Sequence, residues 1–205
     1  MTENIKWFGH ASFKFSGERI IYIDPVNVSD TEKANIILVS HSHYDHFSLQ
    51  DINKLSNSNT NILVTPDVQS KLKDVQGKIT LIEPNKKYNV QGILIETFPA
   101  YNLNKPFHPK DNDWVGFIFT INGKKILYTG DSDLTTELQK FRVDIALVPV
   151  SGKYVMNPKE AADLVNLIKP KLAIPYHYGS IVGSMEDAQK FKSLTQIPVN
   201  ILRKE

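Results

Sequence analysis

The stretch LVSHSHYDHF, residues 38–47, places four candidate metal ligands directly after an apolar run. Three of the chain's six histidines lie here together with an aspartate: His41, His43, Asp45 and His46. Imidazole nitrogen and carboxylate oxygen are ligands of divalent transition metals. In an extended chain His41 and His43 point to the same side and can reach one ion, whereas Asp45 and His46 follow a change of direction. The spacing therefore predicts two neighbouring ions. A surface histidine cluster without ligand function is the alternative, and the buried-strand pattern before it disfavours that.

Composition sets limits on the class of protein. The 205 residues have a net charge of +2 and 41% hydrophobic residues, and no basic tract points to nucleic acid or an anionic membrane. No apolar run is long enough for a membrane helix, and the first residues do not resemble a signal peptide. We expect one cytoplasmic domain over residues 1–205. The absence of cysteine excludes disulfides, thiolate nucleophiles and cysteine-ligated metals.

Hydrophobic patterning predicts two halves, each with strands first and strand–helix alternation afterwards. A helix capped by Ser48 follows the histidine stretch, and Asn122-Gly123 predicts a hairpin. Helices are also expected over 67–75, 157–170 and 184–194. Strands are expected over 5–8, 12–16, 19–25, 34–40, 61–66, 78–84, 92–101, 114–131, 144–150, 171–179 and 197–202. Such halves pack sheet to sheet with helices outside.

Two further candidate ligands end predicted strands. Asp131 follows the apolar run KKILYTG, and His177 follows KLAIPY. Active-site residues of α/β proteins collect at the C-terminal ends of strands. Either residue alone would be weak evidence, because a Gly-Asp pair is commonly a turn and an isolated histidine is commonly structural.

The order HSHYDH, YTGDSD and a distal His177 resembles the metallo-β-lactamase superfamily. This resemblance implies a four-layer αβ/βα sandwich with two metal ions. It also implies that His41 and His43 bind the first ion, that Asp45, His46 and His177 bind the second, and that Asp131 bridges them. The stretches WFGHASFKF, IIYIDP, PVSGKYVMNPKEAA and IPYHYG narrow the resemblance to small stand-alone hydrolases similar to the L-ascorbate-6-phosphate lactonase branch.

The first ion lacks a ligand in this assignment. Related members often carry a histidine after a Pro-Ala-x tripeptide, where this chain has Asn102. An amide oxygen is a poor ligand beside imidazoles. We expect the loop to fold back so that His108, flanked by Pro106 and Pro109, completes the site. The alternative is that His108 is solvated and that water or Asn102 completes a weaker site.

Four further residues have candidate supporting roles. Asp24 could orient a metal-bound histidine or simply cap a turn. His10 could face the cleft and bind substrate or be an ordinary turn residue. Tyr154 could donate to a developing oxyanion, although most such tyrosines only pack. Asp45 is expected to orient the attacking water as well as to bind metal.

The expected function is metal-dependent hydrolysis of an ester, a lactone or a phosphodiester of a small molecule, including an anionic one. The expected cofactors are two divalent ions, Zn²⁺ first and Mn²⁺, Fe²⁺ or Ni²⁺ as alternatives. The rival function is a non-catalytic metal-bound binding or scaffold module. Purely structural zinc sites are closed and usually rich in cysteine, whereas this set of ligands leaves room for water, which argues against the rival. Redox chemistry at a di-iron centre is a second rival, and the flavin domain on which such relatives depend is missing here.

Overall fold

The computed structural model describes residues 2–205, which form two six-stranded sheets. The first sheet contains, in spatial order, β1 (Ile5–Gly9), β2 (Ser12–Ser16), β3 (Ile20–Ile23), β4 (Ile36–Val39), β5 (Asn61–Val64) and β6 (Lys78–Leu81). The second contains β12 (Leu172–Tyr176), β11 (Ile145–Pro149), β10 (Lys124–Tyr128), β9 (Val115–Ile121), β8 (Ile93–Pro99) and β7 (Lys87–Val90).

Both sheets combine antiparallel and parallel pairing in the order that the sequence predicts. In the first sheet β1, β2 and β3 are antiparallel neighbours, and β3 to β6 run parallel. In the second sheet β7 to β10 are antiparallel, and β10, β11 and β12 run parallel. The β9–β10 hairpin turns at Asn122-Gly123, where both residues have positive φ as a tight hairpin turn requires.

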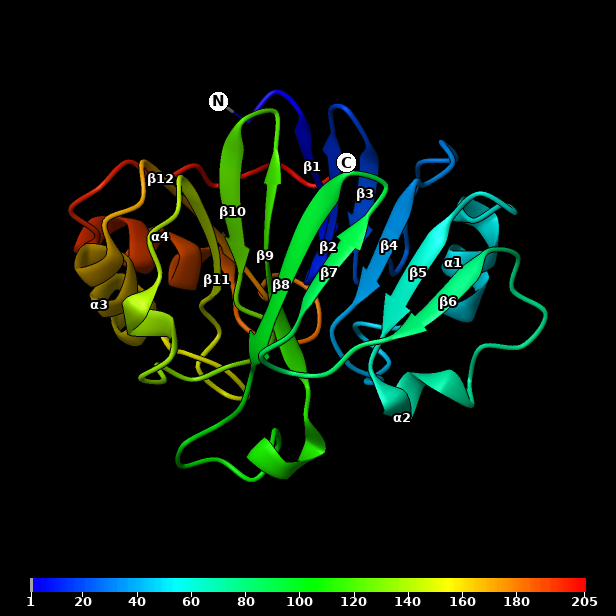
Figure 1. Cartoon of the computed structure of the whole chain (residues 1–205). Coiled ribbons are helices and arrows are strands. Elements are labelled where there is room, and N and C mark those ends of the chain that lie inside the picture. Colours follow the sequence, from blue (N-terminus) through cyan, green and yellow to red (C-terminus); the bar gives the residue numbers. More distant parts are fainter. Residues whose placement is uncertain (1) are drawn as a thin grey trace.

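The helices cover the outer faces of the sheets (Figure 1). Helices α1 (Leu49–Leu55) and α2 (Pro66–Gln69) lie beside the first sheet, and α3 (Pro158–Ile168) and α4 (Met185–Leu194) beside the second. Short 3₁₀ turns lie at Lys110–Asn112 and Leu138–Lys140. Ser48 caps α1 and Asn157 caps α3, because their side chains accept the free N–H groups of the first turn. No helix among residues 2–205 is long and apolar enough to cross a membrane.

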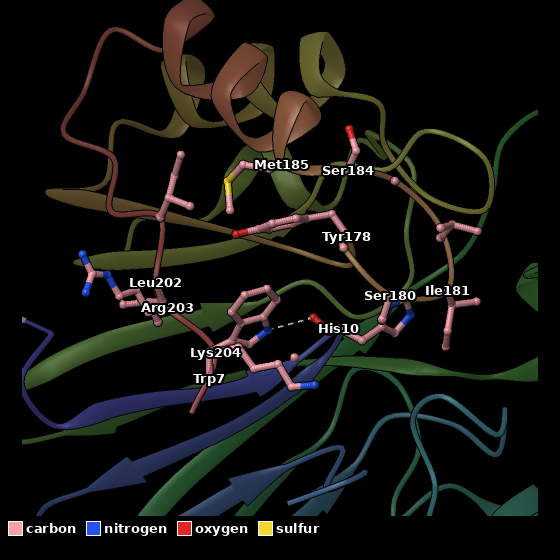
Figure 2. A pocket seen from close by; sticks show the side chains of 15 residues that line it. Trp7, His10, Tyr178, Ser180, Ile181, Ser184, Met185, Leu202, Arg203 and Lys204 are labelled. Carbon is pink, nitrogen blue, oxygen red and sulfur yellow. Dashed lines mark hydrogen bonds between the residues drawn. The ribbon is translucent and has the colours of Figure 1, made fainter.

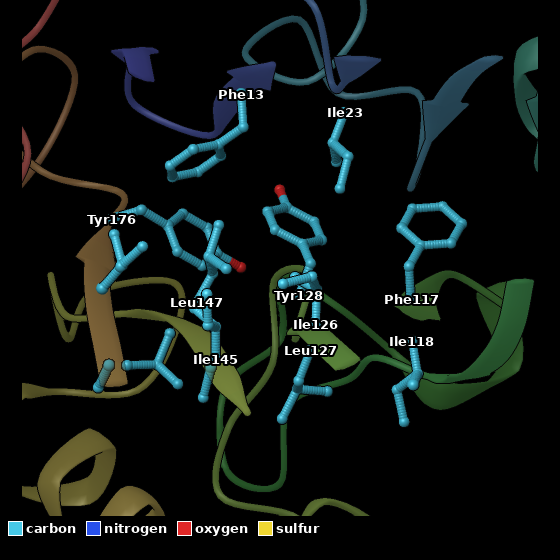
Figure 3. Packing of buried hydrophobic residues seen from close by; sticks show 14 of the residues in the cluster. Phe13, Ile23, Phe117, Ile118, Ile126, Leu127, Tyr128, Ile145, Leu147 and Tyr176 are labelled. Atoms are coloured by element: carbon cyan, nitrogen blue, oxygen red, sulfur yellow. The ribbon is translucent and has the colours of Figure 1, made fainter. Parts of the chain in front are cut away.

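The core lies between the two sheets, where aromatic and aliphatic side chains face each other (Figure 3). Phe15 of β2 meets Phe119 of β9 edge to face at 5.2 Å between ring centroids. Phe13 packs on Tyr128 and Tyr176 in the same way. Apolar residues of α1 and α2 cover the outer face of the first sheet as a separate cluster. This arrangement confirms the predicted four-layer αβ/βα sandwich.

Three local predictions were wrong. The helix expected over 67–75 ends at Gln69, and Asp74 adopts a left-handed conformation that no helix continues through. The strand expected over 197–202 is reduced to one bridge between Val199 and Ala173, because Pro198 lacks the N–H that a ladder needs. Strand β7 was missed, since its residues are only half-buried and polar ones separate them.

Candidate metal centre

The candidate ligands converge at one edge of the sandwich, from five segments of the chain. The histidine stretch follows β4, Asp131 follows β10, and His177 follows β12. His108 comes from the loop between β8 and β9, and His10 from the turn between β1 and β2. The sandwich thus joins segments from both sheets at the ends of their strands.

The first group of donors contains three histidines. The ligand atoms of His41, His43 and His108 lie within 4.8 Å of one another. Trp114 closes one side of this group, with ring centroids 4.8 Å from His41 and 4.6 Å from His43. Its indole Nε1 donates to Asp67 Oδ2 at 2.8 Å. Nothing in the sequence analysis pointed to Trp114 or Asp67, because neither belongs to a recognisable ligand pattern.

The second group contains His10, Asp45, His46 and His177, again with ligand atoms within 4.8 Å of one another. Nε2 of His10 lies 2.9 Å from Oδ2 of Asp45, and the rings of His10 and His177 are 3.9 Å apart. The side chain of His10 therefore faces the cleft and is buried there. The structure places His10 in this donor group, and a role of His10 in substrate binding stays a prediction.

Asp131 stands between the two groups. Its Oδ1 lies 3.2 Å from Nε2 of His46, and its Oδ2 lies 3.2 Å from Nε2 of His108 and 3.1 Å from Nε2 of His177. His41, His46 and Asp131 also form a third close set of donors. A carboxylate in this position can serve two ions at once.

Several of these atoms are buried and have no hydrogen-bond partner among residues 2–205, which is costly for polar atoms. They are Nε2 of His41, His46 and His108, and Oδ1 of Asp131. Two donors bound about 2.0–2.2 Å from a tetrahedral ion lie about 3.4 Å apart. The contacts of 3.1–3.2 Å around Asp131 are close to that spacing. The residues therefore fit divalent metal ions.

The opposite ring nitrogens are held by neighbouring groups, so the free nitrogens point at the centre. His46 Nδ1 lies 2.7 Å from Oδ2 of Asp24, which is buried and also accepts from Tyr128 at 2.6 Å. His177 Nδ1 lies 3.0 Å from Oγ of Ser151. Such partners fix the tautomer and the orientation of a ligand ring. The side chain of Asp24 thus contacts a candidate ligand.

Asn102 lies behind His108, away from the donor cluster. Its Oδ1 is 3.2 Å from His108 Nδ1, and its Nδ2 donates to the carbonyl of Tyr154 at 2.9 Å. His108 is buried, whereas the alternative required a solvated loop. The structure therefore brings His108 to the first group and leaves Asn102 as its neighbour.

Burial and charge set opposite pKa shifts within the cluster. Burial, with His46 nearby, holds the pKa of His41 well below its usual value. Burial also lowers the pKa of His46, but the carboxylates of Asp131 and Asp24 outweigh it and raise that pKa well above normal. Burial opposes ionisation of Asp45, yet the bond from His10 lowers its pKa to about 2. Neutral His41 and ionised Asp45 are the forms that bind metal.

A cavity of about 220 Å³ opens onto the cluster. Asp45, Asp131, His108 and Tyr154 line it, and the exposed Tyr44 and Phe107 lie at its rim. Tyr154 also packs edge to face on Phe107. Tyr176, by contrast, is fully buried and donates to the carbonyl of Gly130 at 2.6 Å. The centre is thus open on one side.

Comparison with known proteins agrees with this geometry. A family model described as a beta-lactamase superfamily domain matches residues 4–177. A UPF0173 metal-dependent hydrolase of Thermococcus onnurineus is 28% identical, with 93% of this chain and 91% of the relative covered. A UPF0173 metal-dependent hydrolase of Thermoplasma acidophilum is 30% identical, and the match covers 94% of this chain and 91% of the relative. A solved structure from Parabacteroides distasonis is 28% identical with a TM-score of 0.84, covering 98% of this chain and 92% of the other. The prediction of a metal-dependent hydrolase is confirmed by these relatives.

Proposed function

Because the chain belongs to the beta-lactamase superfamily, we propose that it uses two divalent metal ions to hydrolyse the ester, lactone or phosphodiester bond of a small molecule. The donors are all nitrogen or oxygen, which suits Zn²⁺ and also Mn²⁺, Fe²⁺ or Ni²⁺. In this proposal His41, His43 and His108 would hold the first ion, Asp45, His46 and His177 would hold the second, and Asp131 would contribute to both.

The observation that carries the proposal is a set of buried donor atoms that have no hydrogen-bond partner among residues 2–205 and that lie beside a cavity. Structural metal sites are closed and leave no position for water or substrate. Here the roughly 220 Å³ cavity has Asp45 and Asp131 in its wall, so a substrate can reach the donor cluster. This openness favours catalysis over a non-catalytic scaffold.

Divalent ions in such a centre supply Lewis acidity and a water molecule of lowered pKa. In the proposed mechanism the ionised carboxylate of Asp45 accepts a hydrogen bond from the attacking water and orients it. His10, 2.9 Å from the same carboxylate oxygen, holds that carboxylate in place. The hydroxyl of Tyr154 donates to the substrate oxygen on which negative charge develops.

The test combines metal analysis of the purified protein with a screen of esters, lactones and phosphodiesters, with and without chelator. We expect turnover of at least one class that chelator abolishes and added metal restores. Asp131→Asn should lose this turnover, whereas Asp111→Asn, the same change on an exposed residue, should keep it. A full metal complement without chelator-sensitive turnover on any class would favour the scaffold function instead.

A further inference from the structure

A second and larger cavity has His10 in its wall (Figure 2), and His10 also belongs to the second group of donors. It has a volume of about 860 Å³, within the range of cavities that hold drug-sized ligands. Its walls come from β1, from the loop after β12 and from the C-terminal segment 201–204. These segments are far apart in sequence and meet only in the folded chain.

An intermediate cavity of about 250 Å³ lies between this space and the cavity at the metal centre and shares lining residues with both. Its lining includes His10 and Lys204, which also line the large cavity, and Tyr44 and Asp45, which also line the cavity at the centre. Ile181 borders all three cavities. The three cavities are thus adjacent, with His10 shared by the large and intermediate cavities and Ile181 shared by all three.

The walls of the large cavity are mainly apolar. Trp7 and Tyr178 pack on each other at 5.0 Å between ring centroids, and Trp7 Nε1 donates to the carbonyl of His10 at 3.0 Å (Figure 2). Ile181 and Met185 are 43% and 46% exposed at its border, although large aliphatic side chains are commonly buried. Neighbouring exposed apolar side chains beside a cleft are typical of a binding surface.

The hydroxyl of Tyr178 and the ammonium group of Lys204, which both line this cavity, have no partner among residues 2–205. The hydroxyl of Tyr178 is buried and makes no hydrogen bond there, and burial raises its pKa to about 12, so it remains a neutral donor. Lys204 forms no ion pair with the described residues. Its methylene groups lie over Gly9, where a β-carbon would come within 3.1 Å of Cε. Lys204 thus stands where the large and intermediate cavities meet.

We propose that the large cavity holds the acyl chain of the substrate, so that the enzyme prefers esters or lactones with an apolar chain of medium length. This inference rests on the proposed function and deepens it. The acyl carbon would lie at the metal centre, and the chain would pass His10 and Ile181 into the cavity. Water adds its oxygen to the acyl carbon, the bond to the alcohol oxygen breaks, and a proton from water goes to the departing alcohol. Lys204 adds attraction for an anionic substituent or for the carboxylate product.

A chain-length series of 4-nitrophenyl esters, from acetate to decanoate, tests this preference in the full chain with its metals. Met185→Trp fills the cavity, and Leu167→Trp makes a similar change on the outer surface of α3, where Leu167 is 51% exposed. We expect kcat/KM to rise with chain length in the parent. Met185→Trp should lower it at least about tenfold for decanoate and less than about twofold for acetate, since each methylene in a pocket contributes about tenfold or more. Leu167→Trp should change neither.

Binding of decanoate, measured by calorimetry, separates failure of this inference from failure of the proposed function. We expect the parent and Leu167→Trp to bind decanoate equally. Met185→Trp should bind it at least about tenfold more weakly, because the added ring occupies the space of the chain. Binding of this kind without ester turnover would overturn the proposed reaction and keep the cavity as an acyl-chain site. Turnover that is indifferent to chain length, with decanoate binding unaffected by Met185→Trp, would overturn the inference.

Discussion

Asn102 and His108 hold each other through one backbone hydrogen bond and one hydrogen bond from backbone to side chain. The N–H of Asn102 donates to the carbonyl of His108 at 2.8 Å, and the N–H of His108 donates to Oδ1 of Asn102 at 3.1 Å. This pair closes the loop between β8 and β9 and turns Nε2 of His108 toward Asp131. Asn102 therefore supports the side chain of His108, the expected third histidine of the first donor group.

This pair leads to opposite expectations for two alanine variants. His108→Ala should lose one of two bound metal ions, because it removes a donor. Asn102→Ala should keep both ions but bind the first about tenfold to hundredfold more weakly, as is typical when the partner of a ligand is removed. Stoichiometry by elemental analysis and affinity by competition with a chelator measure both effects. Unchanged binding in His108→Ala, with one ion lost in Asn102→Ala, would exchange the two roles.

The position of Asp131 predicts that its charge is needed by both ions. Asp131→Asn keeps the shape of the side chain but removes the negative charge between His46, His108 and His177. We expect loss of at least one ion, together with chelator-sensitive activity. Elemental analysis of the purified variant decides this, with Asp111→Asn as the control. Two tightly bound ions in Asp131→Asn would show that the carboxylate is not shared.

His10 lies among possible ligands, but its Nε2 is directed to Asp45. We therefore expect His10→Ala to retain both ions and to lose activity by about tenfold to a hundredfold, as is typical when the partner of a ligand is removed. His177→Ala is the matched comparison from the same donor group and should lose an ion. Metal content and kcat are measured on both variants. Loss of metal from His10→Ala would make His10 a ligand.

The raised pKa of His46 predicts that metal binding releases a proton. Its pKa lies well above 6.5 in the metal-free protein, because the carboxylates of Asp131 and Asp24 outweigh burial, so the ring is protonated at pH 7. A metal ion takes the place of that proton on Nε2. Zinc titrations by calorimetry at pH 7, in buffers of different ionisation enthalpy, should show about one proton released by His46. This proton release on zinc binding should disappear in His46→Ala. The same release in that variant would show that the proton comes from another group.

Asp24 should stabilise the metal-free fold as well as the centre. Its fully buried carboxylate accepts from Ser40, His46 and Tyr128. Asp24→Asn removes the charge that these donors surround, and breaking a buried pair of this kind costs about 3–5 kcal/mol. Chemical unfolding in the presence of chelator measures this free energy without metal. A loss below about 0.5 kcal/mol, as expected for a surface change such as Asp111→Asn, would contradict the structural role.

Most of the architecture follows from local patterns in the sequence. Strand periodicity, the Asn122-Gly123 turn and the caps at Ser48 and Asn157 act within a few residues, so the sequence predicts the order of elements and the two-halved sandwich. The helix over 67–75 and the strand over 197–202 were mispredicted where such local signals are weak or where Pro198 interrupts pairing. Strand β7 depends on its partner β8 rather than on its own pattern.

The sequence alone determined which residues can bind metal, because histidine and aspartate at predicted strand ends are recognisable as possible ligands from residue type and spacing. Only the tertiary structure decided how they are grouped. It placed His10 beside Asp45, set Asn102 behind His108 and brought Trp114 against the first histidines. It also built the large cavity from Trp7, Tyr178 and the C-terminal segment. These relationships depend on how the two sheets pack against each other, and packing between distant segments leaves no local signal in the chain.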